Sequence, residues 1–202
     1  SQVVHGKPLQ FPADLAAHPD YRIEWWYVTA NLTDEQGKEW GVQWTLFRQA
    51  MAAQDAEQAL DGWRSAQVWL GHAALSHAGG HLHDDRLARG GIGQAGVQLD
   101  PFRAWIDEWS LSGDVGPAFS PLRVAAAGEG FSYDLDMQAE RPLVLHGDRG
   151  FSRKSDRGQA SWYYSQPFFE VVGEIQWQGE QHRQCSDAER LRSRFAHPSH
   201  AG

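Results

Sequence analysis

The sequence predicts an all-β protein, an antiparallel barrel of about eight to ten strands. Three observations predict this fold class. Apolar and aromatic segments of strand length recur along the chain, roughly 10–15 residues apart. Helical periodicity is almost absent until the C-terminal tail. Several segments are apolar on both faces, which favours a barrel able to hold one small ligand over a sandwich with a single core.

The most strongly strand-like segment is 21–32, Y-R-I-E-W-W-Y-V-T-A-N-L. Trp26 and Val28 share one face with Glu24, while Trp25 and Tyr27 lie on the other. Because both faces are largely apolar, we expect this strand to be covered on both sides or to line a cavity. An isolated buried carboxylate is costly, so Glu24 should be paired, protonated or close to the barrel rim.

The rest of the chain continues this pattern with a few exceptions. The residues T-D-E-Q-G-K are expected as a hairpin turn into a strand over 39–49, and 50–62 as a short helix or an ordered loop. A turn is expected at 76–85 and a long polar loop at 146–159. Further strands are expected over 63–76, 89–99, 102–111, 121–127, 130–138 and 161–178, the second being weak or bulged because of its glycines.

The two ends of the chain differ from the barrel domain, which we assign to 21–182. Two prolines predict an extended lead-in over 1–20. In the tail, 183–202, Ser186 is followed three residues later by Glu189, the spacing of a capping box. The tail is therefore predicted to hold a short helix followed by a disordered end.

Composition excludes several classes of protein. The net charge of −8 argues against a nucleic-acid partner. No apolar run approaches the ~18 residues of a transmembrane helix. Cys185 is the only cysteine, so the chain has no internal disulfide. No phosphate-cradling loop stands in the required strand–turn–helix context, and the sequence predicts no cofactor.

Five motifs occur in order: E-W-W-Y at 24–27, W-T-L-F-R at 44–48, F-R-A-W-I-D-E-W-S-L at 102–111, L-H-G-D-R-G-F-S-R-K at 145–154 and S-W-Y-Y-S at 161–165. Together they resemble the lipocalin-like family that contains the carotenoid 1,2-hydratases and the AttH-type predicted secreted hydrolases. The resemblance implies a lipocalin-like barrel and a secreted or periplasmic location. It also implies two such halves in a longer chain, of which this chain resembles the first, with an altered end.

The candidate catalytic residues are Asp107 and Glu24. On a strand over 102–111, Trp105 and Trp109 would flank Asp107 on one face, and a dry aromatic pocket would keep its carboxyl protonated. It could then protonate an alkene, with the indole faces stabilising the cation. The alternatives are that this face points outward or that Asp107 pairs with an Arg such as Arg48. The candidate ligand-binding residues are Trp26, Trp44, Trp69, His72, Trp105, Trp109 and Tyr164, with His72 also readable as a core histidine.

Two other chemistries find little support in the sequence. The His and Asp residues at 77–85 have metal-binding side chains, but their spacing matches no rigid zinc pattern, so no metal site is predicted. A serine hydrolase of the elbow type would need G-x-S-x-G, which is absent.

We therefore carry three hypotheses. The first is a lipocalin-like domain that binds an apolar, isoprenoid or lipid-like small molecule in an aromatic-lined cavity. The second is a hydratase-type acid–base enzyme that adds water to an isoprenoid double bond. The third is a half-domain that docks against a second lipocalin-like unit or forms a homodimer.

Overall fold

The structure is a computed structural model that describes residues 9–19, 21–51, 65–114, 120–153, 160–185 and 199–200. In these residues no α-helix occurs, and the one helical turn is a 3-10 turn, Ala13–Leu15, in the lead-in. Almost all remaining elements are antiparallel strands. The all-β antiparallel prediction is confirmed. No described helix is long and apolar enough to cross a membrane.

The first sheet is a four-stranded meander. Its strands are β1 (Ile23–Thr33), β2 (Glu39–Ala50), β3 (Gln67–His77) and β4 (Gly80–Arg89), paired in that order. In β1 the odd-numbered positions are half-buried or exposed and the even-numbered positions are buried, as the period-two pattern requires. The inner face of this sheet therefore carries Glu24, Trp26 and Val28.

The second sheet has seven strands in the order β15-β14-β9-β8-β7-β6-β5. Its strand β9 alternates buried Phe131, Tyr133, Leu135 and Met137 with more exposed polar residues. This confirms the strand expected over 130–138, with one face buried and the other facing solvent. The strands are β5 (Ala95–Leu99), β6 (Phe102–Ile106), β7 (Trp109–Gly113), β8 (Leu122–Gly128), β9 (Phe131–Ala139), β14 (Phe169–Trp177) and β15 (Glu180–Cys185).

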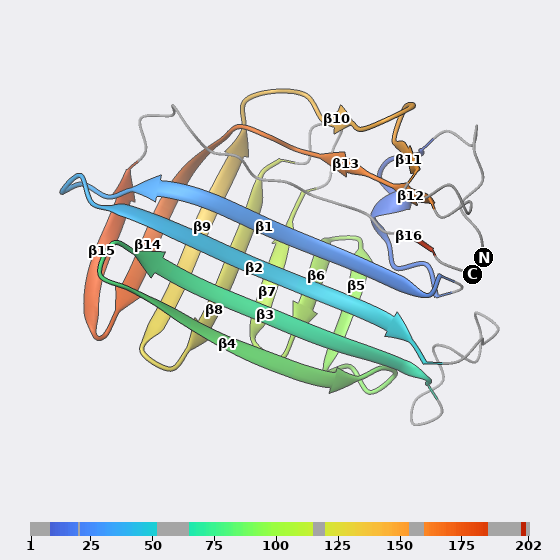
Figure 1. Cartoon of the computed structure of the whole chain (residues 1–202), viewed down its shortest axis with the longest axis horizontal. Coiled ribbons are helices and arrows are strands. Elements are labelled where there is room, and N and C mark those ends of the chain that lie inside the picture. The colour runs from blue at the N-terminus through green and yellow to red at the C-terminus, as the bar shows by residue number, and fades with distance from the viewer. Residues whose placement is uncertain are drawn as a thin grey trace.

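The two sheets lie face to face, and their strands cross at a steep angle in Figure 1. The buried side chains of both inner faces form one contiguous hydrophobic cluster. Aromatic and polar contacts join the sheets directly. For example, the Trp40 and Trp177 rings lie 5.9 Å apart, and the Tyr133 hydroxyl donates to the Gln43 carbonyl at 2.7 Å. Among the described strands, the hydrogen-bonded ladders of these two sheets stay open and do not close into one ring.

A set of short strands lies above β1 in Figure 1 and covers its edge. One pair, β10 (Val144–Leu145) with β13 (Tyr164–Ser165), forms a ribbon. A second group contains β11 (Phe151–Arg153), β12 (Ala160–Trp162) and β16 (Ser199–His200). The segment 146–159, expected as one long loop, therefore contains strand residues at 151–153.

Two local predictions were wrong. The stretch 102–111 is a hairpin of β6 and β7, because the polar pair Asp107–Glu108 makes the turn and Asp107 adopts a left-handed φ of 51° that an Asp tolerates. The stretch 76–85 is mostly the strand β4, whose exposed edge carries His and Asp in place of β-branched residues. The predicted terminal helix and most of 50–62 lie outside the described residues.

Candidate functional site

Glu24 is part of a buried polar network at the start of β1. Its side chain is 0% exposed and that of Arg48, its partner on β2, is 1% exposed. The Arg48 Nε atom donates to Glu24 Oε2 at 2.7 Å, and β1–β2 pairing places the two residues directly opposite each other. The remaining Arg48 donors reach Gln67 and two backbone carbonyls of the lead-in, those of His18 and Tyr21. The expectation that Glu24 is paired is thus met by Arg48.

His18 completes this network from the lead-in. Its backbone N–H and its Nδ1 atom both lie within hydrogen-bond distance of the Glu24 carboxylate, at 2.8 and 2.9 Å. Its Nε2 atom lies 3.5 Å from Asp14. Although burial alone would lower it, the carboxylates of Asp14 and Glu24 together raise the pKa of His18 to about 9. In this network the carboxylates of Asp14 and Glu24 face the cationic groups of His18 and Arg48, so we regard it as structural: it holds the segment before β1 against the first sheet.

A second polar group lies beside β1, on the half-buried side of the ribbon. The Tyr27 and Tyr163 hydroxyls are 3.3 Å apart, and the His146 ring stacks on Tyr163 with a centroid separation of 4.3 Å. His146 Nε2 lies 2.6 Å from the Ser165 hydroxyl. We call Tyr27, His146, Tyr163 and Ser165 the edge cluster.

The antiparallel β10–β13 register explains why these side chains meet. Val144 lies opposite Ser165 and Leu145 opposite Tyr164, and the His146 N–H continues the ladder to the Tyr163 carbonyl at 2.9 Å. Alternate residues of each strand therefore share a face, so His146 falls beside Tyr163 and Ser165. Three separate sequence motifs, at 24–27, 145–154 and 161–165, converge here.

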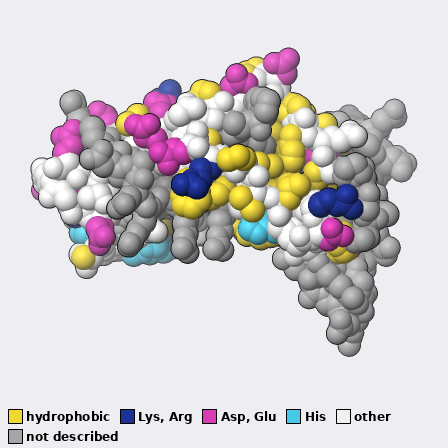
Figure 2. Space-filling model, turned by 90° about the horizontal axis from the view of Figure 1, so that it is seen from above, with side chains coloured by type: hydrophobic (Ala, Val, Ile, Leu, Met, Phe, Trp, Pro, Cys, Tyr) yellow, Lys and Arg dark blue, Asp and Glu magenta, His cyan; other side chains and the backbone are white. Residues whose placement is uncertain are grey.

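Apolar side chains lie close to the edge cluster. Val144 is opposite Ser165 and shares the face of the cluster, whereas Leu145 is opposite Tyr164 on the other face of the ribbon. Both are about two-fifths exposed, as is Phe168, three residues beyond Ser165. In the view from above, hydrophobic side chains gather along the middle of this face, over which β10 and β13 run in Figure 1 (Figure 2). Beneath the ribbon, Tyr164 is fully buried, packs edge-on against Phe11 and donates to the Asp14 carbonyl. Hydrogen-bonding groups thus sit within an apolar surface at this edge.

The predicted tryptophans divide between the core and the surface of the seven-stranded sheet. Trp26 and Trp69 stack at 6.0 Å, and the Trp26 Nε1 donates to the Leu15 carbonyl. Trp44 and Trp109 are fully buried in the core cluster. Trp105 is half-exposed on the outer face of its sheet beside Arg103. Of the predicted site residues, the structure brings Glu24, Trp26, Trp69 and Tyr164 to the same end of the first sheet.

Asp107 lies far from that end, in the β6–β7 turn, and its side chain is 30% exposed. Gln94 donates to its carboxylate at 2.9 Å, and Arg86 approaches to 3.9 Å, so its nearby cation is Arg86 and not Arg48. Trp105 and Trp109 point to opposite faces because the turn separates them. The carboxylate of Asp107 is surrounded by polar groups and is partly exposed to solvent.

His72 lies on the outer face of the first sheet and contacts Asp85 at 2.6 Å. Among the described residues, no group of three or more His, Cys, Asp or Glu side chains is arranged to hold a metal ion.

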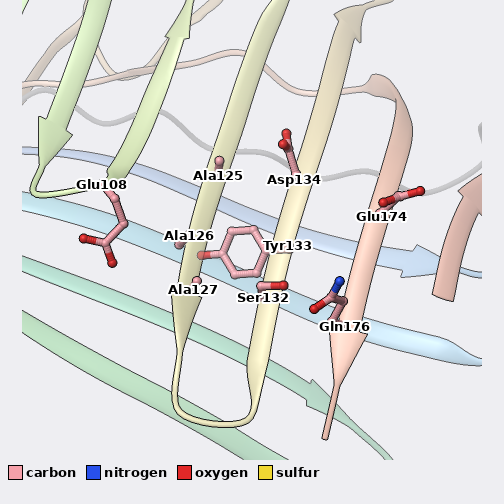
Figure 3. A pocket seen from close by; sticks show the side chains of 9 residues that line it. All are labelled: Glu108, Ala125, Ala126, Ala127, Ser132, Tyr133, Asp134, Glu174 and Gln176. Atoms are coloured by element: carbon pink, nitrogen blue, oxygen red, sulfur yellow. The ribbon is translucent and has the colours of Figure 1, made fainter. Parts of the chain in front are cut away.

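A hollow of about 340 Å³ opens on the outer face of the seven-stranded sheet (Figure 3). Its walls carry Glu108, Asp134 and Glu174, and Arg123 holds the pKa of Asp134 below its usual range. The hollow is acidic and shallow, unlike the aromatic-lined cavity that the sequence predicts.

Sequence reasoning missed the edge cluster for an identifiable reason. It selected Tyr164, which is buried, whereas the neighbouring Tyr163 faces the cluster. His146 was assigned to a loop, because a two-residue strand gives no periodic signal. The sequence signal for these residues was that each of them belongs to one of three motifs, at 24–27, 145–154 and 161–165. That these motifs meet is visible only in the structure.

The two facing antiparallel sheets, with a ribbon and a lead-in covering one edge, define a lipocalin-like all-β protein. The chain belongs to the AttH-like family, whose profile matches residues 2–186. No curated protein matches the sequence.

Two crystal structures share the fold. An AttH protein from Nitrosomonas europaea is 33% identical with a TM-score of 0.76, and the match covers 98% of this chain and 57% of that one. Kievitone hydratase from Nectria haematococca has a TM-score of 0.64 over 96% of this chain and 55% of its own, at 11% identity, a likeness of fold alone. This chain spans little more than half the length of either protein.

Proposed function

We propose that the chain binds an apolar, unsaturated small molecule at the edge cluster. The supporting observation is that exposed Val144 lies on the same face of the ribbon as the hydroxyl and imidazole groups of the cluster, with exposed Phe168 three residues beyond Ser165. Binding sites of small molecules combine these two features, an apolar lining with a few convergent polar groups. Large side chains of both sheets, among them Trp26, Trp44 and Trp109, pack together in the interior, whereas the apolar side chains of the edge are accessible to a ligand.

Quenching of tryptophan fluorescence by a series of isoprenoid and fatty-acid ligands tests this proposal. Introducing a charge with Val144→Asp, on the face of the cluster, removes an apolar contact worth about 1.5–3 kcal/mol, so affinity should fall about tenfold or more. Val172→Asp is the matched control, since Val172 is comparably exposed but lies on β14. Equal affinity of both variants and the unmodified chain would contradict a ligand at the edge.

The second candidate function is addition of water to a double bond of that ligand. It is favoured by His146, which lies 2.6 Å from the Ser165 hydroxyl and stacks on Tyr163, whose hydroxyl lies 3.3 Å from that of Tyr27. In this reaction one carbon gains a proton and the other gains the hydroxyl of water. His146 would give a proton to the first carbon and recover one from the attacking water. The fold shared with kievitone hydratase is compatible with this chemistry.

Hydration is measured as a gain of one water in product mass, with the label retained from ¹⁸O-water. His146→Gln should abolish product formation while leaving fluorescence quenching intact, because the amide fills similar space but cannot carry the proton. Tyr163→Phe should keep binding and reduce the rate. Product formation by His146→Gln at the unmodified rate would exclude His146 as the acid–base group.

A further inference from the structure

The outer face of the four-stranded sheet carries an apolar row that crosses all four strands. The strand registers place Trp25 opposite Phe47, Phe47 opposite Leu70, and Leu70 opposite Leu87. Three of these side chains are strongly exposed, at 37%, 41% and 70% for Phe47, Leu70 and Leu87. We call these four residues the apolar row.

The outer face becomes more polar away from the row. The next residues on one side are Ile23, Gln49, Val68 and Arg89, and those on the other side are Tyr27, Thr45, His72 and Asp85. One step beyond the latter are Thr29, Gln43, Ala74 and His83. A line of exposed large apolar side chains across a sheet face marks an interaction surface. This face lies opposite to the inner face that packs on the seven-stranded sheet, so it is not used by the core.

Charges on β4 flank the row symmetrically. Asp85 stands two residues before Leu87 and Arg89 two residues after it, and all three point outward. Each charge therefore lies about 7 Å from the row along the strand, on opposite sides of it.

We propose that the apolar row is the interface for a second copy of this chain, in a twofold-symmetric dimer of sheets packed face to face. With the twofold axis running along the row between the sheets, each apolar side chain meets its own copy. The same rotation places Asp85 of each copy over Arg89 of the other copy, which gives two ion pairs. Packed sheets lie about 10 Å apart, a distance that an Asp and an Arg side chain together span. The surface is thus self-complementary in shape and charge, as a twofold interface requires.

The dimer is of the weak, reversible kind. Four side chains and two ion pairs cover only part of the roughly 800 Å² per partner of a standard stable complex. Association should therefore depend on protein concentration and, through the charges, on salt.

Sedimentation velocity over a concentration series tests the proposal. The unmodified chain should shift from monomer to dimer, and Leu87→Glu should remain monomeric at every concentration. Val172→Glu is the matched control, because it places the same charge at another exposed apolar strand position, and it should dimerise normally. Circular dichroism of each variant confirms that the fold is kept.

A charge exchange tests the geometry. Arg89→Asp alone sets like charges against each other across the axis and should weaken association at least tenfold, whereas Asp85→Arg combined with Arg89→Asp should restore it. A strictly monomeric unmodified chain would overturn the proposal and leave the row to a different partner. Loss of the dimer in Val172→Glu, or no recovery in the exchanged variant, would overturn the twofold arrangement.

Discussion

Glu24 and Arg48 illustrate how a single buried pair can determine the position of a whole segment. Both are fully buried, and between them they bind the His18 and Tyr21 backbone. Attraction within such a pair roughly offsets the cost of removing both charges from water. Removing Arg48 is different, because Glu24 then stays buried with His18 as its remaining charged partner, and Gln67 and the His18 and Tyr21 carbonyls lose the donors of Arg48.

We therefore expect Arg48→Met to destabilise the protein by about 3–5 kcal/mol. Urea unfolding followed by circular dichroism measures this loss. The control is Arg123→Ala, since Arg123 and Asp134 form an ion pair in which both side chains are about half exposed. That change should cost no more than about 1 kcal/mol. Similar losses for the two variants would contradict the assigned role of the buried pair.

His18 makes stability depend on pH. Its pKa is raised from 6.5 to about 9 in the folded protein. A group whose pKa is raised on folding stabilises the fold fully below its unfolded pKa and loses that contribution as pH rises through the folded value. The free energy of unfolding should therefore fall between about pH 6.5 and pH 9.

The measurement is urea unfolding at a series of pH values from about 6 to about 10, compared with His18→Gln. The variant lacks the titrating group, so its stability should vary less across that window. A parallel decline in both proteins would assign the pH dependence to other groups.

At the scale of elements, Gly173 allows β14 to approach β9 closely. Its φ is 157°, and a Cβ built there would lie 2.1 Å from the Asp134 carbonyl oxygen in the neighbouring strand. Gly37, by contrast, is a left-handed turn residue with open space around its Cβ position.

Gly173→Ala should therefore destabilise the protein more than Gly37→Ala, whose cost is the left-handed backbone alone, about 1–2 kcal/mol. Thermal unfolding of the two variants gives the comparison. If Gly37→Ala lowered the stability as much as Gly173→Ala, crowding between β9 and β14 would not explain the loss of stability in Gly173→Ala.

At the level of elements, the sequence predicted strands well where apolar and polar side chains alternate. It predicted them poorly where polar residues form strands or turns. β1 and β9 were correctly predicted, because aromatic and aliphatic residues occupy most of their buried positions. The strand β4 was missed because its pairing with β3, and not the propensity of its residues, stabilises it. The candidate site was only partly predictable. Pairing was one of three alternatives that the sequence left for Glu24, and His146 reaches Tyr163 only through a ribbon that forms in three dimensions.

At the scale of the whole molecule, the two sheets share one core. Trp40 and Trp177 come from different sheets and pack together, and Tyr133 bonds across to Gln43. Neither sheet can expose its inner face without exposing that of the other. The described parts of the two sheets should therefore unfold as a unit.

We expect tryptophan fluorescence and far-UV circular dichroism to report coincident urea transitions. Fluorescence senses the packed indoles of both sheets, whereas circular dichroism senses the strands themselves. A fluorescence change at clearly lower urea concentration would mean that the sheets separate before they unfold.

Glu24 and Arg48 fasten the chain just before β1 through its main chain. Glu24 accepts the N–H of His18, and Arg48 donates to the carbonyls of His18 and Tyr21, so these contacts do not depend on which side chain Tyr21 carries. Random libraries at Tyr21 should consequently yield many folded clones, whereas libraries at Glu24 or Arg48 should yield few. Exposed positions of the lead-in are thus open to sequence change, while the His18 side chain and two residues on neighbouring strands keep the segment in place.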